Sequence, residues 1–106
     1  MQMNESRLKS PENDALFEAI LKLETVEECY RFFEDICTIV ELKVIAQRLT
    51  VAKLLRENVT YHEISERLGA STATISRVNR ALSYGTGGYG LVLERIGEES
   101  PEGKEP

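Results

Sequence analysis

The sequence has few of the residues that hold metal ions or act in catalysis. Among its 106 residues there are two cysteines, Cys29 and Cys37, and one histidine, His62. A structural zinc site needs about four such ligands at short spacings, so these residues exclude one. Both cysteines fall in an apolar helical pattern, which predicts small buried side chains rather than a disulfide. With no paired carboxylates and no cysteine–histidine pair either, the sequence predicts neither an enzyme nor a protein with a cofactor.

Long apolar runs are also missing. No stretch approaches the roughly 18 apolar residues that a membrane-spanning helix needs. The first residues, MQMNESRLKSPEND, lack the apolar centre of a signal peptide. The composition, with 42% apolar and 29% charged residues, is that of a soluble globular protein. We therefore expect the protein to be cytoplasmic.

Positive charge is scarce overall but concentrated in one part of the chain. The formal net charge is -5, yet residues 43–82 hold seven basic and three acidic residues and carry +4, whereas the rest carries -9. Salt screens charges beyond about 10 Å, so a distant acidic surface does not prevent the basic part from binding phosphates. The charge distribution is thus compatible with a nucleic-acid partner.

The sequence contains several residues of the kind that begin helices. A capping residue precedes each of five predicted helices: Ser10, Thr25, Thr38, Thr60 and Ser71. LVLERI, residues 91–96, indicates a last short helix. The sequence therefore predicts an all-α fold, with one folded domain over residues 11–97. We expect a disordered segment at 1–10 and an acidic, disordered tail at 98–106.

Residues 39–56 are apolar on nearly every side of the predicted helix. Such a helix is buried on several faces, and a chain of this size has too little mass to surround it alone. The pattern favours an intertwined homodimer, because two-fold dimers are the commonest oligomers. A monomeric five-helix bundle is the alternative.

Residues 60–84 have the pattern of a helix-turn-helix. A short capped helix turns Ile64 and Leu68 inward, Gly69 permits a sharp turn, and a second helix turns Ile75 and Val78 inward. The N-terminal end of such a second helix enters the major groove of DNA. The residues expected to contact DNA are Lys53, Arg56, His62, Ser71, Thr72, Ala73, Thr74, Ser76, Arg77 and Arg80.

Each of these residue types has a role in that interface. Arg77 or Arg80 suits a guanine edge, and Ala73 or the methyl group of Thr72 suits a thymine methyl. Lys53 and Arg56 suit backbone phosphates. The alternative is an ordinary helical hairpin whose arginines are only solvated, with His62 as a plain surface residue. That alternative leaves unexplained why residues 43–56 hold four basic and no acidic side chains.

The segment GTGGYG, residues 85–90, formally fits a dinucleotide-binding pattern. That fingerprint requires a preceding strand within a βαβ unit, whereas a helix precedes it here. The segment is therefore predicted to be a flexible turn between helices.

From Thr38 to about Gly85 the chain resembles the Trp repressor family, and within it the YerC/YecD branch. The resemblance rests on ELKVIAQRLTVAKLLRENVTYHEISERLGASTATISRVNRAL and on the spacing between the long helix and the hairpin. It implies an all-helical, intertwined dimer. The two hairpins would meet successive major grooves about 34 Å apart, on a roughly palindromic operator.

The resemblance also implies a ligand pocket between the long helix and the second hairpin helix. Arg48 matches the family arginine on which an indole stacks, Arg77 the one that binds its carboxylate, and Thr38 a pocket residue supplied by the other subunit. Val78 and Ala81 stand where the family has glycine and serine. Overfilling a packed site costs about 1–3 kcal/mol, so tryptophan is not the expected ligand. Either Val78 fills the slot and the protein acts without a ligand, or another small-molecule anion uses the two arginines.

Together these patterns predict a homodimeric transcriptional regulator, a repressor, that binds double-stranded DNA through its helix-turn-helix. The alternative from another class is a helical protein-interaction module that binds an acidic partner surface and no specific DNA.

Overall fold

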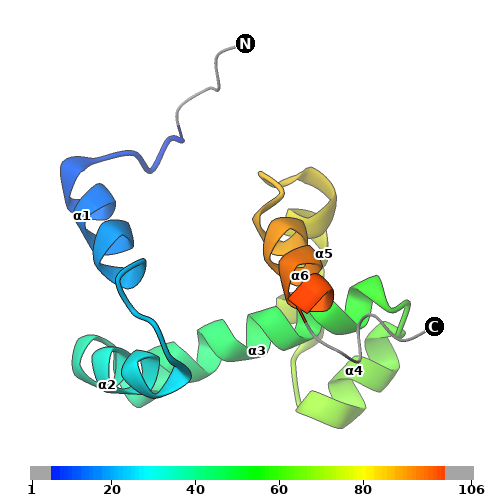
Figure 1. Cartoon of the computed structure of the whole chain (residues 1–106). Coiled ribbons are helices and arrows are strands. Elements are labelled where there is room, and N and C mark those ends of the chain that lie inside the picture. The colour runs from blue at the N-terminus through cyan, green and yellow to red at the C-terminus, as the bar shows by residue number, and fades with distance from the viewer. Residues whose placement is uncertain (1–5, 100–106) are drawn as a thin grey trace. The chain divides into compact units, whose positions relative to one another are not determined.

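The computed structural model describes residues 6–99, which form six α-helices and no strand (Figure 1). The all-α prediction is therefore confirmed. The helices are α1 (Pro11–Ile20), α2 (Val26–Ile36), α3 (Ile39–Arg56), α4 (Tyr61–Leu68), α5 (Thr72–Tyr84) and α6 (Gly88–Glu99). The chain divides between residues 39 and 40 into two compact units.

Side-chain caps explain where four of the helices begin. In each case a hydroxyl oxygen accepts a hydrogen bond from the backbone N–H three residues later. The distances are 3.0 Å for Ser10–Asn13, 3.0 Å for Thr25–Glu28, 3.2 Å for Thr60–Glu63 and 3.1 Å for Ser71–Thr74. Each bond satisfies a donor that the helix itself leaves unpaired, a stabilisation of about 1 kcal/mol. These four predicted caps are confirmed.

The first unit contains α1 and α2, and neither helix has a buried side chain. On α2 the apolar residues share one side, where Phe33 is half-buried and Tyr30 is 61% exposed. Cys29 and Cys37 are free thiols, as predicted, but both are only half-buried. The prediction of buried cysteines is wrong for the single chain, because the described residues of this unit do not cover them.

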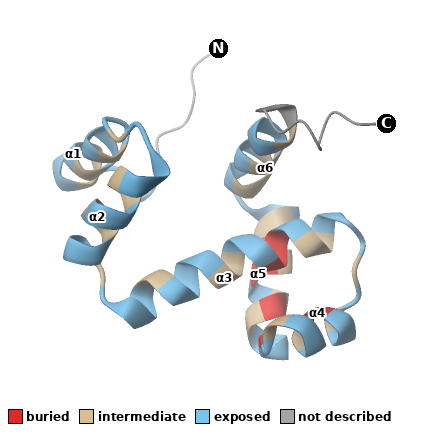
Figure 2. Ribbon diagram, turned by 60° about the horizontal axis from the view of Figure 1, so that its bottom comes forward, coloured by how far each residue is buried: buried red, intermediate tan, exposed pale blue. Residues whose placement is uncertain are grey.

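The second unit holds the hydrophobic core, formed where α4 and α5 pack on the C-terminal half of α3. Its buried members are Val51, Ala52, Ile64, Ala70, Ile75 and Val78. Figure 2 shows that the buried segments lie on α3, α4, α5 and the turn between the last two. The inward positions predicted for Ile64, Ile75 and Val78 are confirmed, and Leu68 is half-buried beside them.

The glycine-rich segment is only partly a turn. α6 begins at Gly88, so Gly88, Tyr89 and Gly90 belong to its first turn, and the predicted turn is limited to residues 85–87. Helix formation here follows from packing, because Tyr89 and Leu93 lie against the core cluster. α6 ends at Glu99, two residues beyond the expected boundary at 97, and the rest of the expected tail lies outside the described residues.

Much of the apolar surface of α3 is open within a single chain. Only Val51 and Ala52 of this helix are buried, whereas Ile39 is 87% and Val40 is 69% exposed. Burial of the helix on several faces, as the sequence predicts, is therefore not achieved by one chain alone.

Candidate nucleic-acid interface

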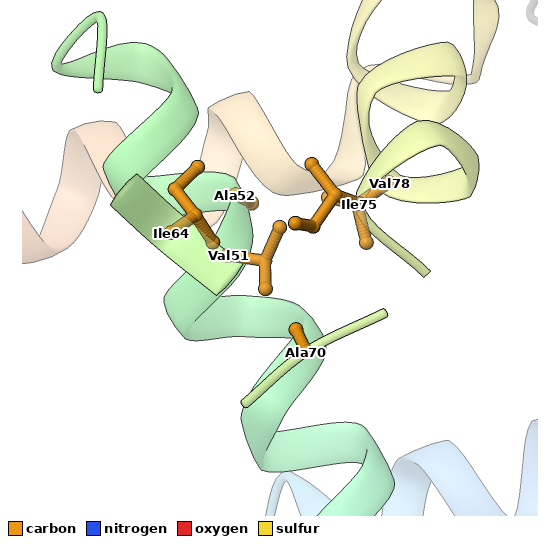
Figure 3. Packing of buried hydrophobic residues seen from close by; sticks show 6 residues of the cluster. All are labelled: Val51, Ala52, Ile64, Ala70, Ile75 and Val78. Carbon is orange, nitrogen blue, oxygen red and sulfur yellow. The ribbon is translucent and has the colours of Figure 1, made fainter. Parts of the chain in front are cut away.

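The two helices of the hairpin are joined by a tight turn docked on α3. Gly69 has φ of 70°, the left-handed conformation that a side chain disfavours, and its N–H donates to the Ser65 carbonyl oxygen over 2.8 Å. The next residue, Ala70, is 3% exposed and packs into the core beside Val51 (Figure 3). The turn is thus held by both its backbone conformation and its burial.

A polar contact holds the same turn to α3. The Gln47 side-chain amide donates to the Leu68 carbonyl oxygen over 3.4 Å, which satisfies one of the acceptors left free at the end of α4. Gln47 lies one helical turn before Val51, so both residues present the same side of α3 to the hairpin. We did not predict this role of Gln47. The spacing of Gln47 from Val51 was the available signal, but it does not show what a glutamine at that place would meet.

The outward side of α5 carries the predicted DNA-contacting residues. Thr72, Ala73, Arg77 and Arg80 are exposed, opposite the buried Ile75 and Val78. Thr74 and Ser76 were also assigned to this surface, but both are half-buried at its edge. The Ser71 hydroxyl is occupied within the hairpin, since it accepts from the Thr74 N–H and donates to the Thr74 hydroxyl oxygen over 3.1 Å.

The positive charge of this surface is not neutralised by the hairpin itself. In the part of the chain that the structure describes, Arg67 pairs with Glu63 over 2.6 Å, whereas no salt bridge reaches Arg77 or Arg80. The backbone N–H groups at the start of α5 add positive potential beside Thr72 and Ala73. The outward side of α5 is therefore suited to an anionic partner.

The other predicted contacts lie on different helices. Lys53 and Arg56 are exposed near the end of α3, and His62 is exposed on the first turn of α4. Arg56 also donates through Nη1 to the Gly90 carbonyl oxygen over 3.4 Å, which joins the end of α3 to the first turn of α6. Lys53 and Arg56 share one side of α3, and the exposed α5 residues share one side of α5.

A mostly apolar groove of about 640 Å³ lies beside the hairpin. It is lined by Ile45, Arg48, Leu49, Ala81, Gly85, Thr86, Gly88, Tyr89 and Val92. The Arg48 Nε is buried without a hydrogen-bond partner in the described residues. A buried donor without a partner costs about 1–3 kcal/mol.

The three residues proposed to bind a ligand include Thr38, which was assigned to the pocket of the other subunit, so their joint site stays a prediction. Arg48 lines the groove, but Arg77 does not, and Thr38 belongs to the first unit. Val78 is 1% exposed and packs in the core rather than in the groove, whereas Ala81 lines it.

In the described residues, no group of three or more histidine, cysteine or acidic side chains is placed to hold a metal ion. None of the helices described is both long and apolar enough to cross a membrane.

Similarity to known proteins agrees with this geometry. The profile of the family described as Trp repressor protein matches residues 12–97. The chain belongs to the Trp repressor family. Its members are regulators rather than enzymes, so membership indicates a DNA-binding regulator.

Individual members of the Trp repressor family are similar over nearly their whole length. A Bacillus subtilis (strain 168) protein, YerC, described as uncharacterized, is 53% identical over 94% of this chain and 96% of its own. A crystal structure of a TrpR like protein from Eubacterium eligens ATCC 27750 is 56% identical, covers 86% of this chain and 94% of its own, and superposes with a TM-score of 0.83. A Staphylococcus aureus protein provisionally assigned as a Trp repressor is 46% identical, covers 93% and 99%, and has a TM-score of 0.84.

Proposed function

We propose that the chain is a cytoplasmic, sequence-specific DNA-binding repressor that acts as a homodimer. The observation that carries this proposal is the exposed, unpaired Arg77 and Arg80 on the outward side of α5 in a helix-turn-helix. Membership of the Trp repressor family supports it.

The geometry supports different DNA contacts for the first turn of α5 and for its two arginines. The first turn, with Thr72 and Ala73, enters the major groove, where small side chains contact thymine methyl groups. Arg77 or Arg80 then pairs with the two acceptors of a guanine edge. Lys53 and Arg56 on α3 contact backbone phosphates, which position the hairpin but do not read sequence.

A second copy of the chain accounts for the apolar surface that one chain leaves open. On α3, Ile39, Val40 and Ile45 are 87%, 69% and 53% exposed, and on α6 Leu91 is 50% and Ile96 is 49% exposed. Exposed large apolar side chains in this number commonly mark a surface that a partner covers. A two-fold dimer would cover them and present two hairpins to a palindromic operator.

The proposal includes DNA binding without tryptophan. Supporting this, Arg77 is not among the residues that line the groove beside Arg48. Ala81, which does line the groove, has no hydroxyl with which to hold an amino acid. The apolar walls of the groove, with Arg48 among its lining residues, suit a small-molecule anion with an apolar body as an effector.

Salt dependence tests DNA binding against the alternative of a protein-interaction module. Two copies each of Lys53 and Arg56 give four phosphate contacts, so the affinity for duplex DNA should fall with a log–log slope of about -3.6. Lys53→Gln removes two of these contacts per dimer and should make the slope shallower by about 1.8. Fluorescence anisotropy of a labelled duplex between about 50 and 200 mM salt measures both slopes.

The matched control is Lys22→Gln, at an exposed lysine of the first unit, which should leave the slope unchanged. Weak binding with a flat salt response would contradict the proposal and favour a protein partner.

A further inference from the structure

The outward side of α5 extends beyond the arginines to an exposed tyrosine. Ala73, Arg77, Arg80 and Tyr84 follow one another at intervals of four, three and four residues, which places them on one side of the helix. We call these four residues the α5 stripe. Tyr84 is 86% exposed, more than any other aromatic side chain among the exposed large hydrophobic residues.

The position of Tyr84 is fixed by the way α5 ends. Gly85 caps the helix, and its N–H donates to the Ala81 carbonyl oxygen over 2.9 Å. A Cβ atom at this position would lie 2.5 Å from that same oxygen, so the backbone here accepts only glycine without moving. Tyr84 is therefore the last residue of a helix with a defined end, on the outward side of the hairpin.

The length of the stripe decides which part of DNA Tyr84 can reach. Tyr84 lies eleven positions after Ala73, which is a distance of about 16.5 Å along the axis at the α-helical rise of about 1.5 Å per residue. The major groove is only about 12 Å wide. With Ala73 at the base edges, Tyr84 lies at or beyond the wall of the groove, where the backbone phosphates are.

The charge around Tyr84 suits the same partner. Residues 67–93 contain three arginines and no acidic residue, so no carboxylate of this segment repels a phosphate near the tyrosine. A phenol hydroxyl is a hydrogen-bond donor of the kind that commonly contacts phosphate oxygens.

We propose that Tyr84 donates a hydrogen bond from its hydroxyl to a backbone phosphate at the edge of the major groove into which α5 inserts. This contact rests on the proposed function. It fixes how far α5 slides along its own axis, and therefore which bases Arg77 and Arg80 meet.

The test compares the wild-type protein with Tyr84→Phe on a duplex that the wild type has enriched from a random-sequence pool. Loss of one hydrogen bond to a charged phosphate from each subunit should weaken binding by more than about tenfold. Because the phenol adds no charge to the interface, the salt slope should not change, whereas Lys53→Gln should make it shallower by about 1.8. Tyr30→Phe, at a 61% exposed tyrosine of the first unit, is the matched control.

A second duplex series locates the contact. Replacing single phosphates by uncharged methylphosphonates should weaken wild-type binding at several positions. At one flanking position the methylphosphonate should weaken binding of the wild type but not of Tyr84→Phe. The two proteins should then bind this duplex with equal affinity, since the two changes remove the same hydrogen bond. The dimer dissociation constant and the melting temperature should be the same for both proteins.

The outcomes separate this contact from the function on which it rests. Failure of the wild type to bind any duplex would overturn the proposed function and the contact with it. Wild-type binding with equal affinity for Tyr84→Phe would overturn the contact alone. A change in the dimer dissociation constant of Tyr84→Phe would also overturn the contact. So would additive losses of affinity from Tyr84→Phe and from the phosphate replacement at every position.

Discussion

At the scale of single residues, Ile64 joins the hairpin to the long helix. It is fully buried in one cluster with Val51 of α3 and Ile75 of α5, so three helices of the second unit share this core (Figure 3). We expect Ile64→Ala to lower the free energy of unfolding by about 2–5 kcal/mol, because the lost side chain leaves a cavity that packed neighbours fill only partly.

Chemical denaturation followed by circular dichroism measures this loss. His62→Ala, at an exposed position of the same helix, is the control and should stay within about 0.5 kcal/mol of the wild type. Equal stability of Ile64→Ala and His62→Ala would mean that this core does not hold the hairpin.

Residue identities predicted the inward side of the hairpin but not every role on α5. The spacing of Ile64, Ile75 and Val78 was enough to predict their burial, which is confirmed. The hypothesis that Val78 fills a ligand slot stays a prediction, and in the structure Val78 packs in the core and does not line the groove. A resemblance aligns residues but does not show which way the packing of a particular chain turns a substituted side chain.

At the scale of helices and turns, the glycines after α5 have different requirements. A Cβ at Gly85 would meet the Ala81 carbonyl oxygen at 2.5 Å, whereas a Cβ at Gly90, inside α6, would meet nothing within 4 Å. We expect Gly85→Ala to lower the free energy of unfolding by more than about 1 kcal/mol, since the end of α5 must move.

Gly90→Ala is the matched control, because it adds the same methyl group without a clash. It should leave stability unchanged or raise it by up to about 1 kcal/mol through the higher helix propensity of alanine. Thermal denaturation of both variants measures the difference. A Gly85→Ala protein as stable as Gly90→Ala would contradict the fixed end of α5, and with it the placement of Tyr84.

Helix starts were predictable because they depend on local signals, whereas the start of α6 was not. Ser10, Thr25, Thr60 and Ser71 cap the helices that they were expected to cap. Gly88 begins α6 in a segment whose glycines favour a turn, because Tyr89 and Leu93 pack on the core. The resemblance implied a pocket between the long helix and the second hairpin helix with Arg48 in it, but not that residues of α6 would line the groove there, since only tertiary packing brings them to it.

At the scale of the whole molecule, the proposed function depends on two separate features of the second unit. One is the hairpin with its unpaired arginines, and the other is the apolar surface of α3 and α6 that a single chain leaves exposed. The first accounts for affinity to DNA, and the second accounts for a dimer that needs two half-sites. Composition alone, with a net charge of -5, would have suggested neither.

Selection of bound duplexes from a random-sequence pool, without any added ligand, tests both features at once. The wild type should enrich a palindromic motif with half-sites about one helical turn apart, and Arg77→Ala/Arg80→Ala should lose that motif while remaining folded. No enrichment by the wild type, or the same motif from both proteins, would contradict the assignment of the α5 arginines as the residues that read DNA.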